Sequence, residues 1–521
     1  MSKTANRLAQ AAILLIITVA ISRVLGYGRE VAMYYYFGIN YFTDAYRAAF
    51  SIPDFLYMIL AGGAIGSALI PVFSGYLAKS LKEQAWRSVS IAFNYTMTVM
   101  LFLLIPAYLF TEPLITLLVP GLPHEYMNLA VYMTHIMFVQ TVFMVLNGFS
   151  MGILNSYGNF LAPAIGSLLY NIVIILIGIS FVHYLGIVAF AYGVVAGAFM
   201  SFLVQIPALV KVKAQYVFSF SWRDEGFKKI IIMMIPVMIG LGVGQFNAFV
   251  TQNIASDMGA GVVTSLNLAQ KIINFPQGIF AVSLASAIFP TLAALVAQKD
   301  WTNFSRISLL GIRAILIIMI PASVGLVLIG RQLIGLCFQQ GNFTAEMTVM
   351  TYQVLIFYSF SIFAYACTQV IDRSFYALED TKTPVLVGII TIAFNVAASI
   401  KLSNMMGQQG LALAYSLAGM TDILLMMTVF RVKVGRIGGR KIMSSFAAAS
   451  GAAFIMALAV KASNFFLGPH LDMVLKAHQL FLIVADIGVG ALVYLLVLYP
   501  FHLEEMELIL GIIKKKIALG H

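Results

Sequence analysis

The chain has 521 residues, of which 61% are hydrophobic and only 10% charged, and its mean hydropathy is +0.95. Water-soluble proteins carry about 25% charged residues, so this composition excludes a soluble protein and indicates an integral membrane protein. The net charge of +11 comes mostly from loops between apolar segments, and it therefore gives no support to a nucleic-acid partner.

Long apolar segments recur along the chain at the length that a helix needs to cross a bilayer, about 20 residues. The sequence therefore predicts an all-α polytopic membrane protein with about 14 transmembrane helices. The predicted spans are 8–36, 43–77, 88–111, 127–154, 161–183, 185–210, 228–256, 262–297, 305–329, 346–378, 384–402, 410–431, 443–465 and 477–500.

Basic residues gather in every second loop, where 22 of the 31 Lys and Arg residues lie on one side of the predicted spans. The positive-inside rule then predicts that both termini face the cytoplasm. After the last span, the segment MELILGIIKKKIALGH (506–521) has the pattern of a basic amphipathic helix at the membrane surface.

The sequence contains an internal repeat. Pro71 and Pro290 each end a long second helix and lie 219 residues apart, and Pro163 and Pro384 each open a fifth helix and lie 221 apart. Two parallel six-helix repeats of this kind enclose a central cavity that rocking can open to either side, although a static bundle is the simpler alternative. The predicted parts are the repeats 1–215 and 222–435, followed by two extra helices and the tail at 440–521.

Several charged residues fall inside or at the edges of the first, second and eighth spans. A charge at the bilayer centre costs about 2.5–3.5 kcal/mol on insertion scales, so such residues normally face a partner or an aqueous cavity. Gly26 and Gly28 predict a bend or a broken turn in the first span. The residues concerned are Arg23, Arg29, Glu30, Asp44, Arg47, Asp54 and Lys271.

The spacing of these residues predicts polar faces. In the eighth span Asn267, Lys271 and Asn274 recur at helical spacing and form one polar stripe. The small surplus of cations favours an anionic ligand, and the planar fork of arginine suits a diphosphate. The alternative is a set of buried salt bridges, such as Arg29 with Asp44 or Glu30, that fixes the helix register.

A cation site is a weaker prediction. Asp422 with Asn247 or Asn395 has suitable oxygen ligands, but the spacing does not require it. No Walker A motif, catalytic triad or metal-ligand motif occurs in the sequence, so we expect a transporter without covalent chemistry and without a cofactor or metal centre. Coupling to Na⁺ or to the membrane potential is left open.

Several segments together resemble the MurJ (MviN) family of lipid II flippases, within the superfamily that includes multidrug, oligosaccharidyl-lipid and polysaccharide exporters. The resemblance runs from residue 22 to about residue 435. It implies a bacterial inner-membrane protein that moves undecaprenyl-diphosphate-linked peptidoglycan precursor outward by alternating access. The segments are SRVLGYGRE, TDAYRAAFSIPDFLYMILAGGAIGSALIPVF, NFPQGIFAVSLASAIFPTLA, CFQQGNFT and RSFYALEDTKTPV.

The resemblance also assigns residues. The functional arginines of the family's first helix match Arg23 and Arg29, the acid that follows is Glu30 where Asp is more usual, and the aspartate of the TDA motif matches Asp44. Two pairs of residues depart from the family pattern. A basic pair in the second helix is replaced by Tyr57 and Met58, and the Asp-Arg pair of the eighth helix is replaced by Gln270 and Lys271.

The resemblance favours a lipid II flippase in cell wall biosynthesis, with lipid II, membrane lipids and cell-wall synthesis proteins as expected partners. A flippase for another polyprenyl-diphosphate-linked oligosaccharide would use the same diphosphate chemistry. A cation-coupled drug exporter would favour acidic rather than arginine-rich cavities, and a scaffold for envelope assembly would not move lipid at all.

Overall fold

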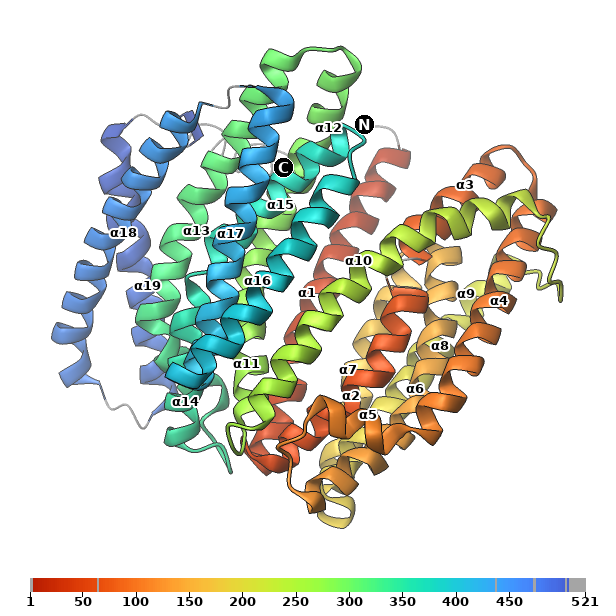
Figure 1. Ribbon diagram of the computed structural model, residues 1–521, viewed down its shortest axis with the longest axis horizontal. Helices are drawn as coiled ribbons and strands as arrows, with labels where there is room; N and C mark the ends of the chain where they lie inside the picture. The colour runs from red at the N-terminus through yellow and green to blue at the C-terminus, as the bar shows by residue number, and fades with distance from the viewer. Residues whose placement is uncertain (1–2, 63–64, 436–437, 472–474, 502–503, 506–521) are drawn as a thin grey trace. The chain divides into compact units, whose positions relative to one another are not determined.

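The computed structural model describes residues 3–62, 65–435, 438–471, 475–501 and 504–505 (Figure 1). Within these ranges every regular element is a helix. The contacts divide the chain into two compact units, Met1–Thr264 with Gln340–Phe343 and Ser265–Gln339 with Thr344–His521. The predicted tail helix, 506–521, lies outside the described residues.

The first unit contains ten α-helices in its described part, and the second of them continues into π-helical turns. The elements are α1 (Lys3–Phe37), α2 (Tyr41–Tyr57), η1 (Met58–Gly62), η2 (Ile65–Leu69), α3 (Ile70–Ala78), α4 (Lys82–Leu109), α5 (Thr111–Leu118), α6 (His124–Ser156), α7 (Leu161–Leu185), α8 (Val188–Leu203), α9 (Ile206–Lys211) and α10 (Glu225–Ser256).

The second unit takes most of α11 and all the helices that follow. These are α11 (Val262–Pro276), η3 (Gln277–Ala281), α12 (Val282–Ala297), α13 (Trp301–Phe338), α14 (Ala345–Ser359), α15 (Ile362–Ala377), α16 (Lys382–Met406), α17 (Gln408–Val434), α18 (Gly439–Leu467), η4 (Gly468–His470), α19 (Lys476–Leu498) and η5 (Tyr499–Phe501). The helices α18 and α19 pack on each other and on α13.

The helices have the length and composition of membrane spans. Among the described residues, 12 helices are long and apolar enough to cross a bilayer, or 13 if α14 and α15, which meet at 45°, form one bent span. The first predicted span falls within the 35-residue helix α1. The prediction of an all-α membrane protein with about 14 helices is therefore confirmed.

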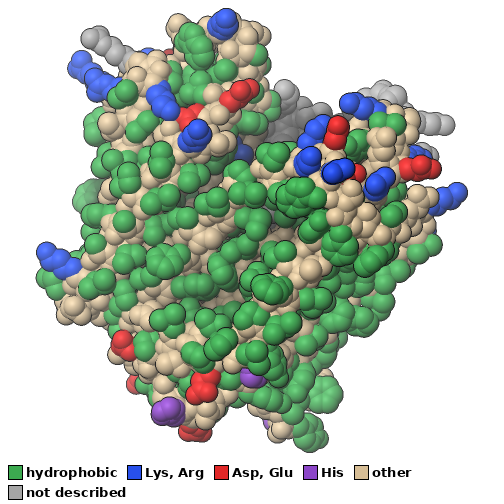
Figure 2. Space-filling model, turned by 45° about the vertical axis from the view of Figure 1, so that its right-hand side comes forward, with side chains coloured by type: hydrophobic (Ala, Val, Ile, Leu, Met, Phe, Trp, Pro, Cys, Tyr) green, Lys and Arg blue, Asp and Glu red, His purple; other side chains and the backbone are tan. Residues whose placement is uncertain are grey.

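Large hydrophobic side chains cover the outer faces of these helices. Phe102 is 73% exposed, Leu424 67% and Phe454 65%. Figure 2 shows hydrophobic side chains over the helix flanks and charged side chains gathered toward helix ends. A surface with so much exposed apolar area suits hydrocarbon, which needs no polar cover. The chain is a multi-pass membrane protein.

Several predicted spans differ in detail from the structure. The first shows no broken turn, because α1 runs unbroken through Gly26 and Gly28. These glycines instead face α7, where an added Cβ would lie 3.9 Å from Asn171 and 3.8 Å from Ile175. The second span is interrupted by η1 and η2, and the tenth is bent between α14 and α15.

Small residues allow α8 to pack tightly on α7 (Figure 1). An added Cβ at Gly193 would lie 3.0 Å from the carbonyl oxygen of Ile174, and one at Gly197 would lie 2.7 Å from that of Tyr170. These two glycines form a Gly-x-x-x-Gly pair, which lets helix backbones approach closely in membranes.

The packing boundary differs from the predicted repeat boundary. By sequence, α10 begins the second half, but its contacts are with α4, α5, η1 and η2 of the first unit. The repeat itself remains a prediction, although the π-helical turns that begin at Met58 and Gln277 lie 219 positions apart, the same offset as Pro71 and Pro290.

Candidate functional site

A buried ion cluster joins α1 and α2 in the first unit. Glu30 is only 3% exposed, and its two carboxylate oxygens contact two different arginines. The Arg29 guanidinium lies 3.2 Å from one oxygen, and the Arg47 guanidinium pairs with the other. Arg47 also donates to the hydroxyl of Tyr34 at 2.8 Å. With two cations on one anion, the cluster keeps one positive charge in excess.

The turn between α1 and α2 brings these residues together. Gly38 adopts a φ of 65°, which places the chain in the left-handed region that glycine tolerates. Asn40 then caps α2, accepting from the backbone N–H of Phe42 at 3.0 Å, while Thr43 accepts from the Asn40 N–H at 3.0 Å. Since α2 begins so soon after α1, its second turn presents Arg47 to Glu30.

Tyr34 is a member of the cluster that the sequence reasoning missed. It is fully buried and lies one helical turn after Glu30, so both side chains share a face of α1. The i, i+4 spacing from a buried acid was the available signal. Its ring also packs against Phe343, at a centroid distance of 6.0 Å.

Three other predicted charges of the first unit lie differently. Asp54 is half-buried on α2. Arg23 is exposed on α1. Asp44 is buried and accepts three hydrogen bonds, from the backbone N–H of Gly261 at 2.6 Å and from the N–H and hydroxyl of Thr264 at 2.8 and 2.6 Å. Asp44 therefore stabilises the turn into α11, and its predicted role in substrate binding remains a prediction.

The polar stripe of the eighth span belongs to the second unit. Asn267 and Lys271 are half-buried on α11, and Asn274 is exposed. The three residues recur at i, i+4 and i+7 along one continuous helix, as predicted, so they share a face. Their predicted role in binding substrate stays a prediction.

The predicted cation ligands are divided between the units. Asp422 is buried on α17, where its two oxygens accept from the hydroxyls of Thr368 at 2.8 Å and Thr391 at 3.0 Å. Asn395 is buried one turn after Thr391 on α16, whereas Asn247 lies on α10 of the first unit. The two threonines were missed, although Thr391 shares a helix face with Asn395.

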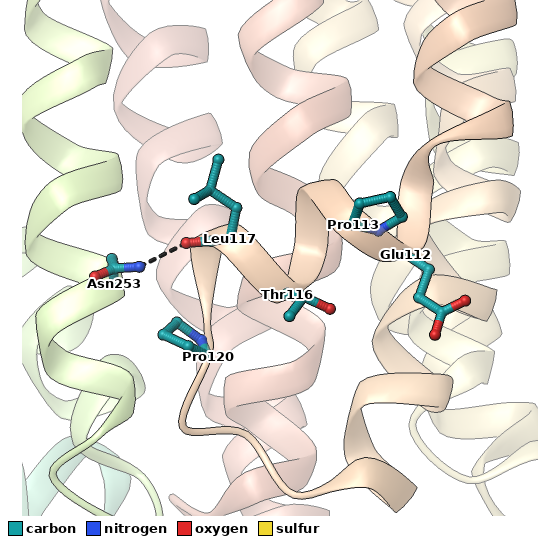
Figure 3. A pocket seen from close by; sticks show the side chains of 6 residues that line it. All are labelled: Glu112, Pro113, Thr116, Leu117, Pro120 and Asn253. Atoms are coloured by element: carbon teal, nitrogen blue, oxygen red, sulfur yellow. Dashed lines mark hydrogen bonds between the residues drawn. The ribbon is translucent and has the colours of Figure 1, made fainter.

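A shallow pocket of about 550 Å³ lies at the end of α5, beside α10 (Figure 3). Asn253 donates to the Leu117 carbonyl at 2.6 Å and closes one side. The lining residues include the carboxylate of Glu112 and no cation, so this pocket does not have the chemistry of an anion site. They are Glu112, Pro113, Thr116, Leu117, Pro120 and Asn253.

Comparisons with known proteins match most of the chain. Residues 33–476 match the family described as lipid II flippase MurJ. Arg29 and Glu30 precede the matched range, while Asp44, Arg47 and the polar stripe of α11 lie within it.

Curated relatives match the chain over similar lengths. A probable lipid II flippase MurJ of Buchnera aphidicola subsp. Acyrthosiphon pisum (strain APS) is 28% identical over 410 residues, which cover 78% of this chain and 80% of that protein. The lipid II flippase MurJ of Burkholderia cenocepacia (strain ATCC BAA-245 / DSM 16553 / LMG 16656 / NCTC 13227 / J2315 / CF5610) is 27% identical over 423 residues, with 79% and 81% covered.

Solved structures give the same result. A lipid II flippase MurJ in an inward closed conformation aligns with a TM-score of 0.79 at 28% identity, covering 94% of this chain and 99% of that chain. An inward-facing multidrug resistance MATE family transporter aligns with a TM-score of 0.66 at 15% identity, covering 82% and 99%, and this likeness concerns the fold alone. From the match over residues 33–476, the chain belongs to the lipid II flippase MurJ family.

Proposed function

We propose that this protein is a lipid II flippase that moves the undecaprenyl-diphosphate-linked peptidoglycan precursor across the bacterial inner membrane for cell wall biosynthesis. Family membership over residues 33–476 is the observation that carries the proposal. The relatives named as lipid II flippases and the aligned MurJ structure support it.

The ion cluster of the first unit supplies the chemistry for a diphosphate. Glu30 neutralises only one of the two guanidinium groups, so the cluster has positive charge available for an anion. Arg29 is 19% exposed and offers a planar fork that can bind phosphate oxygens bidentately. The proposal also assigns Arg23, Asp44 and the α11 residues Asn267, Lys271 and Asn274 to substrate binding.

Transport in this proposal needs no covalent chemistry. An anion that binds the cluster more tightly in one conformation than in another shifts the equilibrium between them, and alternating access follows from that difference. The basic loops favour an orientation with both termini in the cytoplasm. Asp422, with its threonine partners and Asn395, is the proposed cation site if transport is coupled to Na⁺ rather than to the membrane potential alone.

The test is replacement of Arg29 by alanine. Glu30 keeps its pairing with Arg47 in this variant, so the fold should persist while the exposed fork is lost. We expect Arg29→Ala to reach normal levels in the membrane but to fail to complement a flippase-depleted strain. Arg331→Ala, at an exposed arginine on α13, is the matched control and should complement fully.

A direct assay separates the candidate substrates. After depletion, lipid II should accumulate in the inner leaflet, and wild-type protein but not Arg29→Ala should restore its outward movement. Unchanged lipid II distribution, together with accumulation of another polyprenyl-diphosphate-linked oligosaccharide, would instead identify that lipid as the substrate. Full complementation by Arg29→Ala would remove the role assigned to Arg29.

A further inference from the structure

The segment between α9 and α10 contains none of the residues assigned to the proposed substrate site. Residues 215–223, here called the aromatic strap, run beside α4 without forming a helix or a strand (Figure 1). Every second residue from Tyr216 to Trp222 is aromatic. The sequence is QYVFSFSWR, which has an alternation typical of an extended segment with two faces.

Polar groups on α4 hold the strap in place. Asn94 is 5% exposed and donates to the carbonyl oxygen of Ser219 at 2.9 Å, while its own amide oxygen accepts from the Tyr216 hydroxyl at 2.6 Å. Ser90 accepts from the backbone N–H of Val217 at 3.1 Å, and Tyr95 donates to the carbonyl of Phe220 at 2.8 Å. These four contacts fix both the position and the orientation of the strap.

The aromatic side chains of this fixed segment nevertheless keep much of their area exposed. Tyr216 is 60% exposed, Phe218 77%, Phe220 41% and Trp222 59%. The Tyr95 ring packs in T-shaped arrangements with the rings of Phe220 and Trp222. Exposing four large rings to water is unfavourable, since each aromatic side chain has a large apolar area.

The depth of the strap along α4 identifies what covers these rings. Between Arg87 and its end at Leu109, α4 carries no charged side chain, a length of about 33 Å at 1.5 Å per residue. Hydrocarbon is about 30 Å thick, and the strap's attachment points, Ser90 to Tyr95, lie about 4.5–12 Å along α4 from Arg87, so they occupy the end of the span that adjoins the membrane boundary. Tyr and Trp favour this boundary because their rings are apolar and their polar atoms reach water.

Five exposed cations lie at the two ends of the strap, and one of them, Arg223, is its last residue. Exposed acids near it are fewer, with Glu225 at the start of α10. Basic residues next to membrane-inserted aromatics attract anionic headgroups at the surface. The five are Lys211, Lys213, Arg223, Lys228 and Lys229.

We propose that the aromatic strap is a lipid-binding surface, with its rings inserted into the bilayer interface and its flanking cations bound to anionic phospholipid headgroups. Trp222 is a natural probe, since the chain has three tryptophans and the difference in emission between wild type and Trp222→Phe isolates it. The full chain is placed in nanodiscs of phosphatidylcholine that contain brominated phosphatidylglycerol or brominated phosphatidylcholine, because bromine quenches tryptophan on contact.

We expect both brominated lipids to reduce the Trp222 emission by about twofold at saturation, as for a ring at the interface, with brominated phosphatidylglycerol effective at a lower fraction. Iodide in the water should have little effect. Quenching of Trp222 by iodide and not by brominated lipid would overturn the proposal, since the strap would then face water.

A second variant tests whether the cations are required for binding anionic headgroups. Replacing the five flanking cations by glutamine should abolish the preference for brominated phosphatidylglycerol while leaving quenching by brominated phosphatidylcholine intact. A preference that persists would overturn the assignment of anionic headgroups. Loss of both kinds of quenching would show that the cations hold the rings in the bilayer. That result supports the proposal, because the rings and the cations would then act as one lipid-binding surface. Trp301→Phe, at the start of α13, controls for the general effect of removing an exposed tryptophan.

Discussion

Glu30 is the residue on which the ion cluster depends, because it is the acid that contacts both arginines. Its side chain is nearly inaccessible, and each of its oxygens pairs with a different guanidinium. Removing one partner from a buried ion pair costs about 3–5 kcal/mol, since the remaining charge stays in a medium that solvates it poorly. The same charge balance makes the cluster attractive to an anion.

Replacing Glu30 by glutamine should therefore destabilise the protein. The variant leaves two like charges close together, and we expect a loss on the order of 3 kcal/mol. The thermal unfolding midpoint in detergent is the measurement, and Glu346→Gln, at an exposed acid in the first turn of α14, is the matched control. An unchanged midpoint for Glu30→Gln would contradict the ion pairing. If the cluster binds inorganic diphosphate, adding that anion should reduce the difference in unfolding midpoint between the wild type and Glu30→Gln.

Asp380, which lies outside the membrane-spanning segments, should make the stability of the fold depend on pH. Burial raises the pKa of this carboxyl, but hydrogen bonds from Lys433 and Thr383 outweigh burial and lower the pKa to about 2. Because the folded pKa lies below the unfolded value of about 3.9, the charged form stabilises the fold above pH 4. That contribution is lost as the pH falls from about 4 to 2.

The expected result concerns Asp380→Asn. Its midpoint should lie below that of the wild type at pH 7, and the gap should close as the pH is lowered toward 2. The effect is small, at most about 1 kcal/mol, because Lys433 is 45% exposed. A gap that stays constant from pH 7 to pH 2 would show that ionisation of Asp380 does not contribute.

At the scale of elements, the contact between α7 and α8 depends on missing side chains. Gly193 and Gly197 put the backbone of α8 against carbonyl groups of α7, whereas Gly28 on α1 has more room against the same helix. Glycines that look alike in sequence thus differ in how well they tolerate a side chain, because an added Cβ would contact backbone atoms at Gly193 and Gly197 but only a side-chain methyl at Gly28.

Alanine substitutions should separate these positions. Gly197→Ala places a Cβ 2.7 Å from the Tyr170 carbonyl oxygen, so the helices must move apart, at a cost of about 1–3 kcal/mol. Gly28→Ala meets only ordinary contacts and should be neutral or stabilise α1 by about 0.5–1 kcal/mol through reduced backbone entropy. Unfolding midpoints of both purified variants test this, and equal values would contradict the packing argument.

At the scale of the whole molecule, polar contacts hold the final helices α18 and α19 to α13 within the second unit. Arg313 on α13 is buried, donates to Ser445 on α18 at 2.9 Å and pairs with Glu505 near the end of the described chain. Tyr494 on α19 donates to the Ile317 carbonyl of α13 at 2.7 Å. The final helices therefore solvate a charge that α13 otherwise buries alone.

A chain ending at Val434 should be destabilised for this reason. We expect Arg313→Met to raise the unfolding midpoint of the truncated chain, because it removes an unpaired charge. In the full-length protein the same substitution should lower the midpoint, since Glu505 then loses its partner. We therefore expect Arg313→Met to change the midpoint in opposite directions in the truncated and the full-length chain. A decrease of the midpoint in both chains would contradict this prediction.

Local composition was sufficient for much of the architecture. Apolar runs of bilayer length predicted the helices, since any backbone in hydrocarbon must satisfy its own hydrogen bonds. The chemical class of the cluster followed from arginines inside apolar segments, because charge there requires a partner. The resemblance added the family.

Only the tertiary structure decided which charges meet. Glu30, rather than Asp44, pairs with Arg29, and Asp44 instead caps the turn before α11. Such pairings depend on the turn at Gly38 and on contacts between residues more than 200 positions apart, such as Asp44 with Thr264. Hydropathy is a property of each segment alone, so the sequence by itself determined the membrane spans of this protein. The partners of each side chain depend on distances in space, which local sequence does not contain, so only the folded chain decided them.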